Sequence, residues 1–192
     1  MSFQQVVLSL AGGFLENCRL FLETLLFSIP LGLIITFGSM SNFKPLKYLV
    51  KVFVWIIRGT PLMFQLFVVL YVPGLVFGVP MRDRLLAALI AFVINYACYF
   101  SEIFRGGIMS IDKGQFEASR SIGFDYKNTM IYIIIPQAFK NILPALGNEF
   151  IVLVKETSVA GYVALQDLTY VGNMIRSRTY EAFFPLITVA LI

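Results

Sequence analysis

The feature that most limits how this chain can fold is a series of long apolar runs. They lie at about residues 18–38, 48–72, 85–109 and 137–154, and a shorter one begins near residue 183. A soluble protein of 192 residues could not bury all of them, and charged residues make up only 14% of the chain, against about 25% in soluble domains. We therefore predict an all-α integral membrane protein with about five transmembrane helices.

The two ends of the chain and its rare residue types narrow the class further. A helix needs about 20 residues to cross a bilayer, so we expect the run from residue 183 to be a span truncated at Ile192. Residues 1–15 hold no Lys or Arg, which a cleaved signal peptide would need, so the first span should be retained. The sequence lacks histidine, and Cys18 and Cys98 lie in apolar surroundings. We expect no metal site and no catalytic residue.

Basic residues near the membrane predict the orientation, because they favour the cytoplasmic side. More of them lie around the first and third connections than around the amino terminus and the other connections. The first group is Lys44, Lys47, Lys51, Arg105, Lys113, Arg120, Lys127 and Lys140, and the second is Arg19, Arg82, Arg84, Arg176 and Arg178. We predict an external amino terminus, a turn at residues 73–84, and a cytoplasmic loop at residues 110–130.

That long loop and its exit read EASRSIGFDYKNTMIYIIIPQA over residues 117–138. The order of acidic, small, glycine and apolar-proline positions resembles the EAA loop of ABC importer permeases. Ser stands in place of the third-position Ala and Ile in place of Leu, and both changes are mild. The matching positions are Glu117, Ala118, Ser119, Gly123, Ile135 and Pro136.

The residues of the loop agree with the resemblance, which implies short coupling helices that dock on a cytoplasmic ATPase. We expect Glu117 at a helix start, where a negative charge suits the helix dipole. Gly123 permits a turn between two short helices, and Phe124 offers an apolar contact to a partner. An ordinary solvated loop is the alternative. The chain has no phosphate-binding loop motif, so ATP and Mg²⁺ should bind to the partner ATPase and not to this chain.

Three further stretches resemble the permeases of polar amino-acid ABC importers. They are IIRGTPLMFQLF (56–67), SEIFRGGIMSI (101–111) and LVKETSVAGYVALQDLTYVG (153–172). The resemblance implies a type I importer permease fold over a single transmembrane domain, residues 1–192, whose coupling loop spans about 110–136. It also implies a multi-pass protein of the bacterial plasma (inner) membrane. Its expected partners are two ATPase subunits, a second permease subunit, identical or not, an extracellular or periplasmic substrate-binding protein, the amino acid and membrane lipid, but no nucleic acid.

A break in the second apolar run points to a substrate pathway. Pro61 cannot donate a helical hydrogen bond and pushes Thr60 out of helical geometry, and irregular backbone at membrane depth must line a cavity or be buried in protein. Arg58 beside the break should face the interior, where its planar guanidinium suits an amino-acid carboxylate. The alternative is a pair between Arg58 and a carboxylate of the protein, such as Glu102.

Polar residues of the third run allow two interpretations. Glu102 and Arg105 are spaced for an i,i+3 ion pair, which we predict. Asn95 and Tyr99 lie further into the run. They could line the substrate pathway, and ordinary contacts between helices would also explain them.

The fourth run carries two carboxylates, Glu149 and Glu156, at a spacing of two helical turns, about 10 Å along one face. Such a pair within a membrane protein calls for cationic partners. Some basic-amino-acid permeases of the resembled family carry acidic residues at this spacing, which implies arginine, lysine or ornithine as the substrate. The glutamates could instead pair with Arg58, Arg105 or Lys155. A permease for glutamine, glutamate or cystine, or a channel without an ATPase, is the other open possibility.

Overall fold

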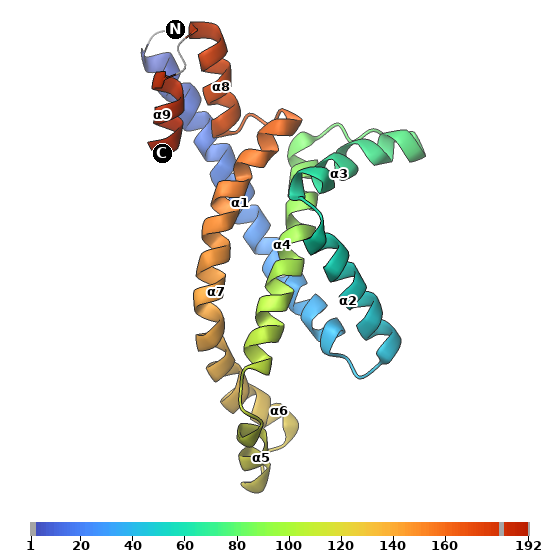
Figure 1. The fold of residues 1–192 in the computed structure, drawn as a ribbon. Helices are drawn as coiled ribbons and strands as arrows, with labels where there is room; N and C mark the ends of the chain where they lie inside the picture. Colours follow the sequence, from blue (N-terminus) through green and yellow to red (C-terminus); the bar gives the residue numbers. More distant parts are fainter. Residues whose placement is uncertain (1–2, 181–182, 192) are drawn as a thin grey trace. The chain divides into compact units, whose positions relative to one another are not determined.

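The computed structural model describes residues 3–180 and 183–191, and within these residues it contains helices and no strand (Figure 1). Two of the eleven elements in the described part of the chain depart from α-helical geometry: η1 is a π-helix and η2 a 3₁₀-helix. The elements are α1 Phe3–Met40, α2 Lys44–Gly59, α3 Leu62–Phe77, α4 Arg84–Met109, α5 Lys113–Ser121, α6 Tyr126–Thr129, η1 Met130–Ile134, α7 Ile135–Glu156, η2 Thr157–Val163, α8 Leu168–Thr179 and α9 Phe183–Leu191.

The apolar runs form the helices that the sequence predicts. Three helical stretches of the described residues, Gln4–Met40, Arg84–Met109 and Tyr126–Val163, are long and apolar enough to cross a membrane. The broken pair α2 and α3 adds a fourth if it counts as one span. The last predicted run forms α9, which ends at Leu191 and is too short to cross by itself.

Contacts between the helices divide the chain into two compact units, and the long helices α1, α4 and α7 contribute residues to both. The first unit comprises Met1–Phe27, Thr60–Ile94 and Val152–Ile192, and the second comprises Ser28–Gly59 and Asn95–Ile151.

In the first unit, α8 and α9 lie beside the beginning of α1 (Figure 1). A buried apolar cluster joins α1 to α8, and Val189 of α9 packs against it. Gly172 of α8 allows this approach, because a Cβ atom there would lie 2.6 Å from Cγ2 of Val189. The clustered residues are Val6, Leu10, Leu168, Val171 and Ile175.

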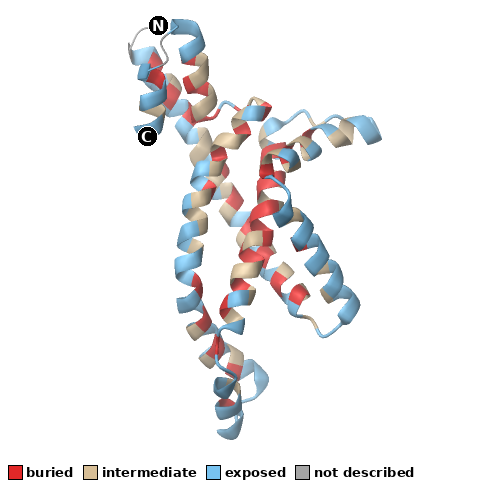
Figure 2. Cartoon of the chain, viewed as in Figure 1, coloured by how far each residue is buried: buried red, intermediate tan, exposed pale blue. Residues whose placement is uncertain are grey.

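In the second unit, aromatic side chains recur every four residues on α4 and form the core. Tyr96 and Phe100 are fully buried, and Phe104 continues the same face. Phe150 of α7 meets Phe100 edge to face, with ring centroids 6.2 Å apart and planes at 82°, an arrangement that aromatic pairs favour. The buried face of α4 stands out against the exposed surface of α2 in Figure 2.

Two boundaries differ from the prediction. The first helix begins at Phe3 rather than near residue 18, because the preceding residues are also mostly apolar and contain no proline. Residues 73–84 are not one turn, since α3 continues through Pro73 to Phe77. Gly78 caps the end of this helix: its φ of 68° is left-handed, and its backbone N–H donates to the Pro73 carbonyl.

Two neighbouring glycines of α4 allow a test of the packing within the second unit. A Cβ atom at Gly107 would collide with the Ile142 side chain of α7 and lie 3.3 Å from the Ala138 carbonyl oxygen, whereas one at Gly106 meets nothing within 4 Å. We expect Gly107→Leu to destabilise the fold by about 1–3 kcal/mol through overpacking. Gly106→Leu, the matched control, should have a much smaller effect. Thermal unfolding in detergent measures both, and equal losses would contradict this packing.

Candidate functional site

The segment predicted to couple to an ATPase folds as two short helices, α5 and α6, joined at Gly123. Gly123 has a φ of +90°, a left-handed conformation that glycine adopts without steric cost, so the predicted turn is confirmed. Aspartates cap both helices: Asp112 Oδ1 accepts from the Gly114 N–H at 2.6 Å, and Asp125 Oδ1 accepts from the Asn128 N–H at 2.7 Å.

The predicted position of Glu117 at a helix start is wrong, because α5 begins four residues earlier at Lys113. Asp112 lies directly before Lys113 and caps the helix, and this capping signal determines where α5 begins. Ser119 is buried, and its hydroxyl lies 2.9 Å from that of Thr129, which braces α5 against α6.

Most of this segment is exposed (Figure 2), and part of its surface is apolar. Ile122 and Tyr126 have 73% and 67% of their surfaces exposed, and Phe124 is 37% exposed. Glu117, Ala118 and Pro136 are exposed as well. Apolar side chains beside exposed charges are typical of a protein contact surface.

The break in the second run lies where the sequence predicts it. The helix α2 ends at Gly59, and Pro61 is extended (φ −60°, ψ 138°) before α3 begins. Gln65 Nε2 donates to the Thr60 carbonyl at 3.0 Å and to the Thr60 hydroxyl at 2.9 Å. Thr60 therefore has a structural role in the break. The sequence analysis does not predict this role of Gln65, whose place one turn into α3 lets its side chain reach back to Thr60.

Arg58 and Tyr99, two predicted site residues, lie together in the second unit. The Arg58 guanidinium carbon is 4.9 Å from the centroid of the Tyr99 ring, a favourable cation–π distance, and Arg58 itself is exposed. Asn95, one turn before Tyr99 on α4, is buried.

The predicted ion pair of α4 is confirmed. Arg105 Nε and Nη2 donate to the two carboxylate oxygens of Glu102 at 3.1 and 2.5 Å. This bidentate bond occupies both Glu102 oxygens, which disfavours Glu102 as the partner of Arg58.

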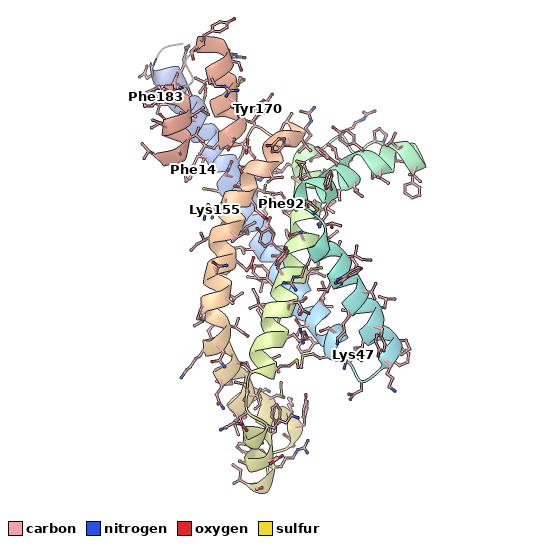
Figure 3. The ribbon with its side chains drawn as sticks, viewed as in Figure 1. Phe14, Lys47, Phe92, Lys155, Tyr170 and Phe183 are labelled. Atoms are coloured by element: carbon pink, nitrogen blue, oxygen red, sulfur yellow. The ribbon has the colours of Figure 1, made fainter. Side chains whose placement is uncertain are left out.

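The two carboxylates of α7 lie on one uninterrupted helix, since Ile135–Glu156 forms a single α-helix. Glu149 and Glu156 are both half-buried, whereas Lys155 is exposed and projects from the last turn (Figure 3). Seven residues are close to two full turns, so both carboxylates leave the same face of α7. Glu156 ends the helix, and η2 begins at the next residue.

Relatives with known names support the class that this architecture defines. Residues 28–192 match the family of binding-protein-dependent transport system inner membrane components. The chain is 38% identical to the L-cystine transport system permease protein TcyB of Bacillus subtilis, over 90% of this chain and 73% of that protein. It is 35% identical to the arginine transport system permease protein ArtQ of the same species, over 94% and 82%.

A solved structure is also closely similar. A crystal structure of an amino acid ABC transporter with histidines aligns with a TM-score of 0.89 and 38% identity, over 100% of this chain and 90% of that one.

These observations define a membrane-spanning helical protein with the type I ABC permease fold. The chain belongs to the binding-protein-dependent transport system inner membrane component family, and it is a permease subunit for amino acids. The predicted resemblance and fold are thereby confirmed.

Proposed function

We propose that this permease moves basic amino acids, namely arginine, lysine or ornithine, as part of an ATP-driven importer. The observation that carries the proposal is the pair Glu149 and Glu156, half-buried on one face of α7. Carboxylates within a membrane protein are costly unless they meet positive charge. A cationic amino acid offers such charge through its α-ammonium group and its side chain.

Arg58 supplies the complementary charge for the substrate. Tyr99 holds its guanidinium from one side, and the planar group can bind an α-carboxylate through two parallel hydrogen bonds. Asn95, on the same side of the helix as Tyr99 one turn away, adds an amide to this part of α4. Thr60 ranks below these residues as a substrate contact because Gln65 binds its hydroxyl.

Glutamine or cystine remains the second candidate substrate class. Arginine and cystine are named for two similar relatives, so likeness alone favours neither class. The carboxylates of α7 favour the cationic one.

We further propose that the α5–α6 segment docks on an ATPase subunit, which binds ATP and Mg²⁺. Exposed Ile122, Phe124 and Tyr126 give this segment an apolar surface, and the two aspartate caps and the Ser119–Thr129 contact keep its shape fixed. A preformed contact surface loses little entropy on binding. The remaining proposed partners are a second ATPase subunit, a second permease subunit and an external substrate-binding protein.

Co-expression with candidate ATPase subunits encoded by neighbouring genes tests the proposed partnership. We expect the ATPase to co-purify with the permease and its ATP hydrolysis to rise when substrate-loaded binding protein is added. The chain isolated without an ATPase and giving ion currents in planar bilayers would instead identify a channel.

The proposed orientation can be tested by labelling in intact cells. Single cysteines at Lys113 and Val79, both exposed, are introduced in a background where Cys18 and Cys98 are serine. Val79 is preferable to Gly78, whose left-handed backbone would be strained by a side chain. We expect a membrane-impermeant maleimide to label the cysteine at position 79 and to spare the one at 113 until the cells are opened. The reverse pattern would contradict the orientation inferred from the basic residues.

A further inference from the structure

Asp167 is a buried acidic residue at the start of α8 that the transport proposal does not use. Only 1% of its surface is exposed, and it lies outside the candidate membrane spans. Its Oδ1 atom accepts a hydrogen bond from the Tyr170 N–H at 2.7 Å and caps α8. Its Oδ2 atom has no hydrogen-bond partner among the described residues. A charged carboxylate is costly in such a place, because the group is removed from water and one of its two oxygens gains no hydrogen bond in return.

The backbones of α1 and η2 approach Asp167 and Leu168 closely, at Gly13 and Gly161. These four residues form the seat of α8. A Cβ atom at Gly161 of η2 would lie 2.8 Å from Asp167 Oδ1, and one at Gly13 of α1 would lie 2.9 Å from the Leu168 Cα. At Gly13 the backbone of α1 therefore approaches the backbone at the start of α8, and at Gly161 the backbone of η2 approaches the Asp167 carboxylate itself. These close approaches and the 1% exposure of Asp167 keep its carboxylate out of contact with water while α8 is packed on η2 and α1.

Asn17 of α1 fastens the same seat by two hydrogen bonds. Its Oδ1 accepts from the Leu168 N–H at 3.0 Å, and its Nδ2 donates to the Thr157 hydroxyl oxygen at 2.9 Å. That hydroxyl in turn donates to the Val154 carbonyl at 2.7 Å. The two hydrogen bonds of Asn17 thus connect the start of α8 to Thr157, the residue that directly follows Glu156.

Charged side chains of the surrounding elements line a cavity of about 660 Å³ beside the seat. Two of these cationic side chains donate hydrogen bonds to acceptors other than Asp167. Arg84 Nη1 donates to the Ala164 carbonyl at 3.2 Å, and Arg19 Nε donates to Glu23 at 2.9 Å. The charged lining residues are Glu16 and Arg19 of α1, Arg82, Asp83 and Arg84. Burial is the largest influence on Asp167 and raises its pKa from 3.8 to about 6, against the opposing hydrogen bond from the Tyr170 N–H.

We propose that Asp167 is a proton-binding site and that the proton controls how firmly α8 is fastened to α1 and η2. A solvent proton binds the carboxylate to give the neutral acid, which fits the buried seat. An acid with a raised pKa stabilises the folded arrangement fully below its ordinary pKa of 3.8 and loses that contribution as the pH rises through about 6. The seat is therefore tight in acid and weaker at neutral pH, whatever substrate the permease carries.

Asp125 offers a matched control within the same chain. It caps α6 with the same backbone angles as Asp167, φ −73° and ψ 173°. The cap bonds are both 2.7 Å. Asp125 is exposed and Asp167 is buried, so burial distinguishes the two caps.

Hydrogen–deuterium exchange of the transporter in lipid nanodiscs tests the proposal. Peptides covering 168–171 and 126–129 are compared at pH 5 and pH 8, with labelling times corrected for the intrinsic pH dependence of exchange. Each pKa unit changes an opening equilibrium tenfold, and about one unit of the difference between 3.8 and about 6 lies above pH 5. We therefore expect protection at 168–171 to be up to about 10-fold lower at pH 8 than at pH 5 where opening exposes Asp167. Protection at 126–129 should not change.

Two variants distinguish the effect of proton binding from the effect of helix capping. Asp167→Asn keeps an oxygen that can cap α8 but cannot ionise, so protection at 168–171 should be equal at both pH values. Asp125→Asn should retain the wild-type fall. Equal wild-type protection at both pH values, or a wild-type fall retained in Asp167→Asn, would overturn the proposal. If Asp167→Asn does not assemble, the wild-type comparison of the two peptides still decides.

Discussion

Replacing Gly123 by aspartate is expected to abolish ATP-driven uptake while the membrane helices remain folded. The backbone at Gly123 has a φ of +90°, which costs other residues about 1–2 kcal/mol. A carboxylate here would also enter the proposed ATPase contact without a partner, at a cost of several kcal/mol. By the usual conversion of free energy to affinity, the ATPase should bind at least about 100-fold more weakly. Co-purification, stimulated ATP hydrolysis and proteoliposome uptake measure this loss.

Gly123→Asn is the control that separates charge from backbone strain. Asparagine matches aspartate in size and adopts left-handed geometry more readily than most residues, but it carries no charge. We expect Gly123→Asn to keep most of the ATPase contact. Full stimulated hydrolysis and uptake by Gly123→Asp would show that the α5–α6 segment does not dock there, and equal loss in both variants would assign the effect to the turn itself.

Removing a carboxylate from α7 is expected to change which amino acid is carried. A charge-assisted hydrogen bond contributes about 1.5–3 kcal/mol, so Glu149→Gln should reduce uptake of arginine and lysine about 10- to 100-fold. Glutamine lacks the side-chain cation and should lose less. Uptake of the three labelled amino acids into proteoliposomes, with binding protein and ATP, gives the comparison.

Neighbouring positions on α7 supply the controls for this experiment. Lys155 is exposed and belongs to another face of the helix, so Lys155→Gln should leave the preference among the three amino acids unchanged. Glu156→Gln should resemble Glu149→Gln. Equal losses for all three amino acids would identify the glutamates as structural, and no loss for any would remove them from the pathway.

Local sequence signals predicted the features that depend on neighbouring residues. The break at Pro61, the turn at Gly123 and the ion pair of Glu102 with Arg105 follow from proline geometry, glycine freedom and helical spacing. Each needs only a few consecutive residues, and the structure has each of them.

Features that depend on contacts between distant segments could not be predicted in this way. The position of Tyr99 beneath Arg58 and the bonds of Asn17 to η2 and α8 require knowing which helices meet. The burial of Asp167 has the same origin, since an Asp before a helix usually caps it in water. The start of α5, in contrast, depends on a local signal, the cap at Asp112, which lies five residues before the Glu117 of the motif.

The most direct test of the proposed function is uptake by the wild-type transporter reconstituted with its ATPase and binding protein. We predict ATP-dependent accumulation of labelled arginine that excess lysine or ornithine inhibits strongly and excess glutamine inhibits weakly. Accumulation that glutamine inhibits as well as lysine does, or no ATP-dependent accumulation of arginine, would contradict a permease for basic amino acids.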